Sequence, residues 1–328
     1  MQGDFFLTTW FLVAMKWLYS NFGSVVLTIL VSTIILRSIT IFSDIKTRKS
    51  SANMAALQPE INKIQKKYKD DPRRAQQEQS KLMKARGVSM WSSCLPLLIT
   101  MPLFFCFFAA FRFWSYEETI RLLVDDNATE ILKSFKFLWV HNIWQADSGL
   151  QPVVMQASNF LNTKDLANLL YLKDNPEIWD KLQSMGIAVK ELVYVVGKDG
   201  VGQWQSVGRF LTDETAIAAY NSAIQPLLDV YAGKNNGWFV WPVICAGTSF
   251  LSMWLSQKNT PQPAAGAQGA NQGKLMSYIF PVMSFIICLT STTAFALYWT
   301  VSSAMQIIIT FILNKIYPRT PAIEEVKK

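Results

Sequence analysis

Histidine is almost missing from this chain of 328 residues, which contains only His141. A single histidine excludes histidine clusters that bind transition metals, and it leaves a nucleophile–histidine pair only if His141 itself takes part. No pair of carboxylates stands within an apolar stretch, and no glycine-rich phosphate loop occurs. We therefore expect no enzyme activity, no metal site and no cofactor.

Cysteine is also scarce. All of the cysteines fall within or at the ends of apolar stretches, at Cys94, Cys106, Cys245 and Cys288. Free cysteine in such places behaves as a small hydrophobic residue. No pair lies in a long polar loop, so we expect buried free thiols and no disulfide framework.

Polar residues are too few for an ordinary soluble domain, because 51% of the residues are hydrophobic and only 16% are charged. A chain made only of membrane spans would be less polar still. The sequence therefore predicts an all-α polytopic membrane protein with sizeable soluble segments. Five stretches could each cross a bilayer as a transmembrane helix, namely 24–42, 94–112, 238–256, 276–291 and 293–314.

The last two of these spans form one apolar run that is too long for a single helix across a hydrocarbon core of about 30 Å. We expect this run to turn within LTSTTA, residues 289–294. The fourth span is then short, and it should thin the bilayer locally or tilt little.

The N-terminus lacks the basic start of a secretory signal peptide. Its aromatic residues Trp10, Trp17 and Tyr19 suit the interface between lipid and water. We interpret 1–23 as an interfacial amphipathic helix lying in the membrane surface. A first membrane span or an uncleaved signal is the alternative.

Charge is distributed unevenly along the chain. Segment 43–93 carries twelve basic and five acidic residues, whereas segment 115–237 carries ten basic and fifteen acidic residues. The positive-inside rule places 43–93 in the cytoplasm. The loop 113–237 and the N-terminus are then extracytoplasmic, and the linker 257–275 and the C-terminal tail 315–328 are cytoplasmic.

The cytoplasmic segment 43–93 has the pattern of a helical hairpin. Asp71 can cap its second helix, with Pro72 at the first helical position. Apolar residues recur every three or four positions in its first half, at Met54, Leu57, Ile61, Ile64 and Tyr68. The hairpin's basic surface favours contact with anionic lipids, ribosomal RNA or a partner protein, and a merely solvated face is the alternative. This surface is expected to include Lys63, Lys66, Lys67, Arg73 and Arg74.

The extracytoplasmic loop 113–237 is long enough to contain a soluble insertion of α or α+β structure, at about 150–235. Its pattern predicts short helices at 164–173, 176–185 and 213–232. In the stretch LVYVVGKDGVGQW, the turn GKDG stands between an apolar run and GQW, which is typical of a β-hairpin.

Arg37 stands inside the first predicted span, where an arginine at mid-bilayer costs about 2.5–3.5 kcal/mol. Only Asp44, at the edge of the span, could be a carboxylate partner nearby. The side chain could snorkel to the cytoplasmic interface, or a water-filled cavity open to the cytoplasm could solvate it.

Other predicted spans carry polar atoms for such a cavity. One stripe of the last span contains Trp299, Ser303, Gln306 and Thr310, and a weaker stripe of the third contains Cys245, Thr248 and Ser252. Ordinary packing between membrane helices is the alternative role of such small hydroxyls.

Several separated motifs resemble the YidC/Oxa/Alb family of membrane protein insertases. In chain order they are ILVSTIILRSITIF, MAALQPEINKIQKKYKDDPRRAQQEQSKLMKARGVS, CLPLLITMPLFFCFFAAFR, FLWVHNIW, WFVWPVICAGTSFLSMWLSQ and YIFPVMSFIICLTSTTAFALYWTVSSAMQIIITFILNK. The resemblance covers about 1–147 and 236–316. This sequence departs from the family pattern at three places: the turn before the last span reads TSTTAFA, the outer loop is longer, and the C-terminal tail is short and weakly basic.

The resemblance implies five transmembrane helices around a hydrophilic groove that is open to the cytoplasm and the lipid. The family's groove arginine falls on Arg37, its accompanying hydroxyl on Thr33, and its aromatic pair on Tyr298 and Trp299. With the polar stripe, the candidate groove residues are Arg37, Thr33, Tyr298, Trp299, Ser303 and Gln306.

The resemblance also implies a function: insertion of newly made membrane proteins into the bacterial inner membrane, alone or beside the Sec translocon. Expected partners are nascent membrane proteins, anionic lipids and, where the protein does not act alone, the Sec translocon. The ribosome would be contacted through the basic hairpin and only weakly through the tail. No binding to DNA is expected. Two alternatives stay open, an assembly chaperone without autonomous insertion and a small-solute transporter.

Overall fold

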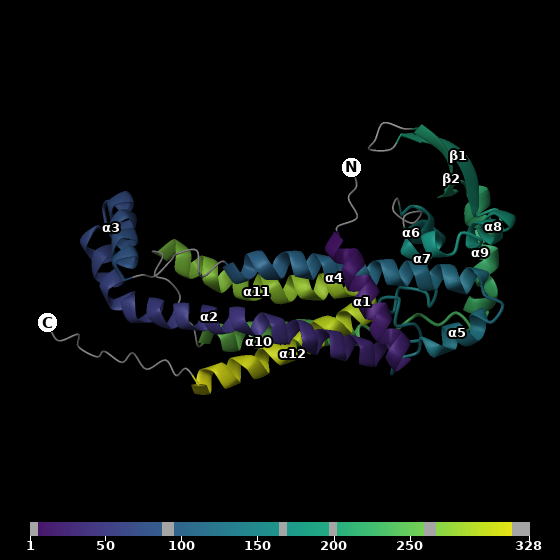
Figure 1. Ribbon diagram of the computed structural model, residues 1–328. Coiled ribbons are helices and arrows are strands. Elements are labelled where there is room, and N and C mark those ends of the chain that lie inside the picture. Colours follow the sequence, from purple (N-terminus) through teal and green to yellow (C-terminus); the bar gives the residue numbers. More distant parts are fainter. Residues whose placement is uncertain (1–5, 87–94, 164–168, 197–201, 259–266, 317–328) are drawn as a thin grey trace. The chain divides into compact units, whose positions relative to one another are not determined.

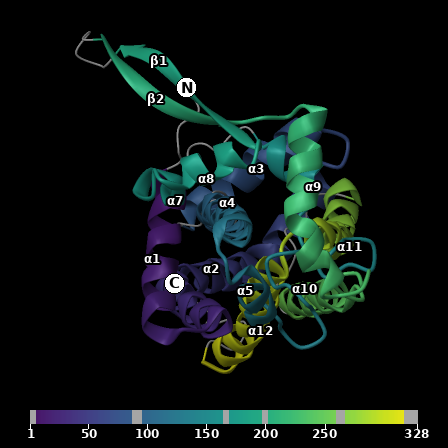
Figure 2. The same cartoon turned by 90° about the vertical axis from the view of Figure 1, so that its right-hand side faces the viewer.

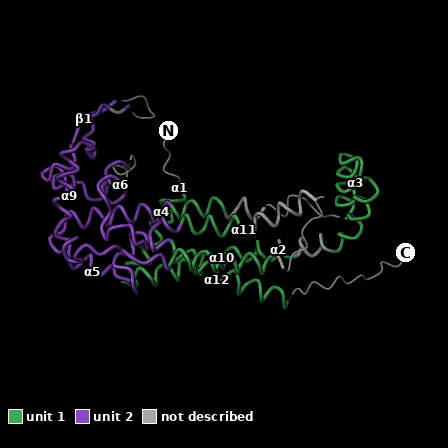
Figure 3. Tube along the Cα trace, turned by 180° about the vertical axis from the view of Figure 1, so that it is seen from behind, with its two compact units in different colours: residues 1–108, 241–287, 296–328 green, residues 109–240, 288–295 purple. Residues whose placement is uncertain are grey.

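The chain folds mainly into helices (Figure 1). The computed structural model describes residues 6–86, 95–163, 169–196, 202–258 and 267–316. These residues divide into two compact units (Figure 3). Unit 1 comprises Met1–Phe108, Trp241–Ile287 and Ala296–Lys328, and unit 2 comprises Ala109–Val240 and Cys288–Phe295.

Unit 1 is all-helical in the described residues. Its helices are α1 (Phe6–Phe22), α2 (Val25–Lys67), α3 (Pro72–Ala85), the first half of α4 (Leu95–Val124), α10 (Val240–Lys258), α11 (Ala267–Thr290) and α12 (Thr293–Ile316). The turn between α1 and α2 is set locally. Gly23 adopts a φ of +62°, which only glycine takes without strain, and the Ser24 hydroxyl caps α2 by accepting from the Leu27 amide at 3.4 Å.

Helix α2 runs without a break from the first predicted span into the predicted hairpin. The predicted boundary between the span and the hairpin, between residues 42 and 43, is absent from the structure, because no glycine or proline interrupts the helix there. Pro59 lies further along, inside the helix. One continuous element therefore joins Arg37 to the basic hairpin.

Helix α3 begins as the sequence predicts. The Asp71 carboxylate accepts a hydrogen bond from the Arg74 amide at 3.0 Å, and Pro72 is the first helical residue. The hairpin has a small core of its own in which Leu57 and Ile61 of α2 pack with Met83 of α3. Met54 and the expected stop at Gly87 lie outside what the structure describes at side-chain level.

Two helices in the described part of the chain are long and apolar enough to cross a membrane, residues Val25–Lys46 of α2 and Thr293–Ile316. Shorter apolar helices cover Val240–Ser256 and Tyr278–Thr290. The arrangement of five spans stays a prediction. The turn between the last two spans is confirmed, because α11 ends at Thr290 and α12 begins at Thr293.

The predicted linker 257–275 needs correction. Helix α11 already begins at Ala267, so residues 267–275 are helical. After Pro263 the segment contains alanine and glutamine, which favour helix, and no proline before Pro281. The rest of the linker at 259–266, and the tail from 317 onward, lie outside the described residues.

Unit 2 contains short helices and one two-stranded sheet. Besides the second half of α4, its elements are α5 (Ala128–Ser134), α6 (Ala157–Leu161), α7 (Leu170–Asp174), α8 (Ile178–Ser184), β1 (Ala188–Val196), β2 (Gly202–Phe210) and α9 (Glu214–Asp229). The β-hairpin is confirmed, with β1 and β2 antiparallel (Figure 2). The compact unit starts at Ala109, well before the predicted insertion at about 150.

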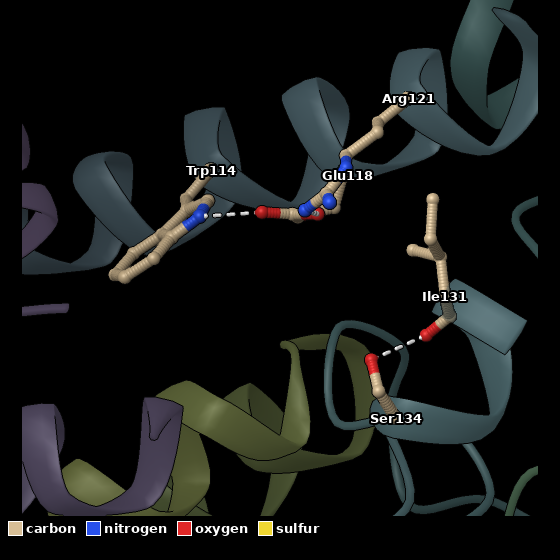
Figure 4. A network of polar contacts seen from close by, with 5 residues as sticks. All are labelled: Trp114, Glu118, Arg121, Ile131 and Ser134. Carbon is tan, nitrogen blue, oxygen red and sulfur yellow. Dashed lines mark hydrogen bonds and ion pairs between the residues drawn. The ribbon is translucent and has the colours of Figure 1, made fainter. Parts of the chain in front are cut away.

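Aromatic side chains form the core of unit 2. Trp114 of α4 packs on Trp144 at a centroid distance of 4.8 Å, and Phe160 of α6 stacks on Tyr220 of α9 at 5.3 Å. The Trp114 indole donates to Glu118 at 2.9 Å, and Arg121 pairs with the same carboxylate at 3.6 Å (Figure 4). Close by in the same view, Ser134 donates to the Ile131 carbonyl at the end of α5.

Two buried asparagines tie distant loops of unit 2 together. The Asn236 side chain accepts from the Asn142 amide at 2.8 Å and donates to the carbonyl of Asn142 at 2.9 Å. The Thr293 amide, at the start of α12, donates to the Gln145 carbonyl at 2.9 Å. These bonds fix the loop 139–147 within the unit, including most of the motif FLWVHNIW.

Candidate functional site

Arg37 lies on α2, within the apolar segment Val25–Lys46. Its guanidinium reaches α12, and all of its hydrogen bonds in the described residues go to that helix. Nε donates to the Ser302 hydroxyl at 2.9 Å, Nη1 to the Gln306 side-chain oxygen at 2.9 Å, and Nη2 to the Ser302 carbonyl at 3.0 Å. The predicted association of Arg37 with Gln306 is present in this geometry.

All of these acceptors are neutral. A guanidinium has five N–H groups, and acceptors among the described residues occupy three of them. Asp44 interacts electrostatically with Arg37, but its Oδ2 atom is buried without a hydrogen-bond partner in the described part of the chain. These neutral acceptors thus hold the guanidinium in position without supplying a counter-charge of their own.

The sequence of α12 explains how these acceptors come together. Ser302 and Gln306 are four residues apart, so they lie one above the other on the same helical face. Sequence reasoning selected Ser303 and missed Ser302, which is buried and faces Arg37. The spacing to Gln306 pointed equally to both serines, because residues three and four apart share a face.

The aromatic pair Tyr298 and Trp299 lies one turn before this site. Tyr298 is buried, and its ring stacks on Phe107 of α4 at 4.7 Å. Trp299 is partly exposed, donates from its indole to the Ser249 hydroxyl of α10 at 2.8 Å, and meets Phe104 edge-on at 4.9 Å. Both rings therefore contribute to helix packing in unit 1.

Two further predicted polar residues serve helix packing. Thr33 is fully buried and donates to the Ile29 carbonyl of its own helix at 2.6 Å. Cys245 of α10 lies against α12, with its sulfur 3.2 Å from the Ala296 carbonyl. Cys106, Cys245 and Cys288 are buried and outside any disulfide of the described residues, and Cys94 lies outside those residues.

A second polar contact joins α2 to α12. The Arg48 guanidinium donates to the Asn314 side-chain oxygen. Arg48 comes eleven residues after Arg37, and Asn314 comes eight residues after Gln306, so the two helices run in the same direction past each other. Sequence reasoning missed this contact because neither residue belongs to the polar stripes.

The predicted basic surface of the hairpin is exposed. It consists of Lys63, Lys66, Lys67, Arg73 and Arg74. The cationic groups of Lys67 and Arg74 lie 5.4 and 5.2 Å from the Tyr68 ring centroid, so cation–π contacts hold part of this charge at the tip of the hairpin. The structure describes no cluster of three or more metal-ligating side chains.

The sequence of this chain matches a family model and several curated proteins. The family model of the 60 kDa inner membrane protein matches residues 17–197 and 209–320. Curated relatives named membrane protein insertase YidC are similar over parts of the chain. The Clostridium perfringens protein is 37% identical over 139 residues, 42% of this chain and 52% of the relative.

Two other curated relatives with the same name are also similar to parts of the chain. The Clostridium tetani protein is 36% identical over 115 residues, 35% of this chain and 46% of the relative. The Aquifex aeolicus protein is 33% identical over 149 residues, 45% of this chain and 27% of the relative. The chain thus spans about half or less of the length of these relatives. Because the family model covers most of its residues, the chain belongs to the YidC/Oxa/Alb family of inner membrane proteins.

Proposed function

We propose that this protein inserts newly made membrane proteins into the lipid bilayer. The observation that carries the proposal is Arg37, a cation in an apolar helix that neutral acceptors hold and no carboxylate neutralises within ion-pair distance in the described residues. A purely structural arginine would be expected to pair with a carboxylate or to snorkel. A positioned guanidinium with no carboxylate at ion-pair distance in the described residues suits transient binding of acidic residues.

The physical task is to move a polar flank across lipid. Each unsatisfied polar group costs several kcal/mol in the hydrocarbon core. A hydrophilic groove beside Arg37, open to the cytoplasm and the lipid, shortens the dry path. The buried, unpartnered Oδ2 of Asp44 supports such a wet environment, because a buried carboxylate oxygen needs a donor from protein or water.

Trp299 offers the more accessible aromatic surface for the apolar part of the substrate. It is partly exposed, whereas Tyr298 is buried against Phe107. The apolar segment leaves sideways into lipid, and its partition supplies the energy. For acidic flanks the membrane potential adds about 2.3 kcal/mol per charge per 100 mV.

The remaining parts of the proposal concern orientation and partners. The basic hairpin faces the cytoplasm and meets anionic lipid or the ribosome as a chain emerges. Unit 2 and the N-terminus are extracytoplasmic, and α1 lies in the membrane interface. The protein acts alone or beside the Sec translocon.

The test is insertion by the purified protein in proteoliposomes. The substrates are two single-span proteins that differ only in an acidic or a neutral translocated flank, and protease protection of the flank is measured. Arg37→Ala should lower protection of the acidic flank more than that of the neutral flank, and Arg37→Lys should be milder. Arg209→Ala, which removes an exposed charge in unit 2, is the matched control and should behave as the wild type.

Equal loss for both flanks would remove the electrostatic role of Arg37. No protection above that of empty liposomes would instead favour an assembly chaperone or dependence on the Sec translocon.

A further inference from the structure

The β1–β2 hairpin of unit 2 carries an apolar face whose outer half is exposed, with no described residue of the unit over it. Register pairs Leu192 with Ser206, Tyr194 with Trp204 and Val196 with Gly202, so these pairs lie on one face. The exposed fractions of Leu192, Tyr194, Val196 and Trp204 are 71%, 54%, 60% and 68%. Tyr194 and Trp204 contact each other edge-on at 5.4 Å.

The base of the same face is buried in the unit. Trp179 of α8 lies directly over Gly208, where an added Cβ atom would be 2.2 Å from the indole, and it packs on Phe210 at 5.1 Å. The outer half of the face continues this apolar strip into solvent. The end of the strands near Phe210 therefore packs on α8, and the end near Trp204 exposes its side chains.

The charged side chains of the two strands are already paired in the described residues. Arg209 donates to Glu191 at 2.7 Å on the opposite face, and Lys190 pairs with Asp180 at the base. That opposite face exposes Gln203 and Gln205 together with Val193 and Val207. The two faces therefore differ: one carries an outer strip of large aliphatic and aromatic side chains, and the other mixes charged, amide and valine side chains.

The geometry points to a lipid surface as the occupant of this face: the hairpin dips Leu192, Tyr194, Val196 and Trp204 into the interfacial region of the membrane. Tyrosine and tryptophan concentrate at that depth because each has an apolar ring and a polar group. A two-stranded hairpin exposing four large apolar side chains to water would otherwise risk association with other chains.

Chain continuity keeps a membrane within reach of the hairpin. Unit 2 contains the second half of α4, the residue that begins α10, and the turn Cys288–Phe295 that joins the apolar helices α11 and α12. Figures 1 and 3 show the strands running from the α8–α9 end of unit 2 back toward the end at which α4 enters it. The strands thus belong to a unit that is continuous along the chain with apolar helices.

The test uses the full chain in nanodiscs of zwitterionic phosphatidylcholine. A small environment-sensitive fluorophore is attached to Leu192→Cys, and the matched control is Gln205→Cys on the opposite face. The wild-type chain, carried through the same labelling, measures background from its own cysteines. Quenching by nitroxide lipids reports contact with lipid, and quenching by iodide reports contact with water.

We expect nitroxide lipids to quench the label at 192 several-fold more than the label at 205, and iodide to show the reverse order. Salt should leave both results unchanged, because no unpaired charge takes part. Adding Tyr194→Ser and Trp204→Ser should weaken lipid quenching at 192, while near-ultraviolet circular dichroism confirms folding.

Equal iodide quenching at the two positions would overturn the inference. Protection of position 192 from iodide without lipid quenching would also overturn it, because another protein surface or a second copy would then cover the strip. These readouts need no insertion activity, so the inference can fail while the proposed function stands.

Discussion

At the scale of single residues, the environment of Arg37 decides what the site can do. Its three hydrogen bonds go to the hydroxyl and carbonyl of Ser302 and to the side chain of Gln306. Such acceptors fix the direction of the guanidinium without cancelling its charge. Orientation and charge are therefore separable, and different substitutions should affect them differently.

Ser302→Ala removes the acceptor of Arg37 Nε and leaves the bonds to Gln306 and to the Ser302 carbonyl. A hydrogen bond to a charged group contributes about 1.5–3 kcal/mol, so we expect Ser302→Ala to lower the free energy of unfolding by about that amount. Thermal unfolding of the detergent-solubilised protein measures this loss. Insertion of acidic flanks should fall less than in Arg37→Ala, because the charge remains.

Ser303→Ala is the matched control, since it removes the neighbouring hydroxyl that makes no bond to Arg37 in this geometry. Its effect should stay within about 0.5 kcal/mol. Equal effects of the two substitutions would contradict the assignment of Ser302 as the partner.

His141 is the single histidine, and it lies in the loop of unit 2 that the asparagines fix. Burial lowers its pKa below the ordinary value of 6.5, and the nearby charges of Lys136 and Lys234 lower the pKa further. Its ring packs against Tyr231 at 4.8 Å, and its Nδ1 atom is buried without a hydrogen-bond partner among the described residues. The folded state therefore favours the neutral imidazole.

The folded pKa is lower than the unfolded pKa, so the unfolded state binds more protons as the pH falls. Stability from this group is present above pH 6.5 and declines as the pH falls toward the folded pKa. We expect the melting temperature to drop between about pH 8 and about pH 5. His141→Phe keeps a ring against Tyr231 and cannot titrate, so its decline should be smaller. Parallel curves for the two proteins would contradict this account.

At the scale of elements, the continuity of α2 links the Arg37 site to the basic hairpin. The helix covers Val25–Lys67, and its last turns pack on α3 through Leu57, Ile61 and Met83. This satellite core is small, so each buried side chain matters to the docking of α3. The hairpin should open locally without unfolding the rest of α2.

Ile61→Ala leaves a cavity in this core, because Ile61 is almost fully buried. Such substitutions cost about 2–5 kcal/mol. We expect faster amide hydrogen exchange in α3, by about thirtyfold or more if the cost reaches about 2 kcal/mol. Exchange in α12 should not change.

Lys63→Ala tests the same helix at an exposed position two residues away. Alanine favours helix, so the exchange of α3 should stay near that of the wild type. Faster exchange in this variant would mean that the docking of α3 depends on surface charge rather than on the buried cluster.

At the scale of the whole molecule, the chain divides into two compact units. Unit 1 is built from apolar helices, and unit 2 has an aromatic core with a buried tyrosine. Burial raises the pKa of Tyr220 well above its usual value, so its hydroxyl stays protonated and donates to the Met155 carbonyl at 2.7 Å. Local damage to one core should leave the other unit folded.

Tyr220→Phe leaves that buried carbonyl without its donor, which costs about 1–3 kcal/mol. We expect peptides of unit 2 to lose protection from hydrogen exchange at a lower temperature, while peptides of α12 keep the wild-type profile. Tyr278→Phe, at an exposed position of α11, should change neither. A shift of both profiles together would show that the two units unfold as one.

Several features could be predicted from the sequence because they depend only on neighbours along the chain. The cap at Asp71, the turn between α11 and α12 and the β-hairpin follow from side chains within a few residues of each backbone position. The pairing of Arg37 with Gln306 was predictable for another reason, because a cation among apolar residues needs polar partners and the spans offer few.

Which face of each helix meets its neighbour depends on packing between segments that are far apart in the sequence. Ser302 rather than Ser303 serves Arg37 because the rotation of α12 is set by its packing through Tyr298 and Trp299. The bonds between Asn142 and Asn236 join loops that are far apart in sequence, and no local pattern records them. Helical spacing limits the candidates to one stripe, and the choice within that stripe depends on contacts with distant parts of the chain.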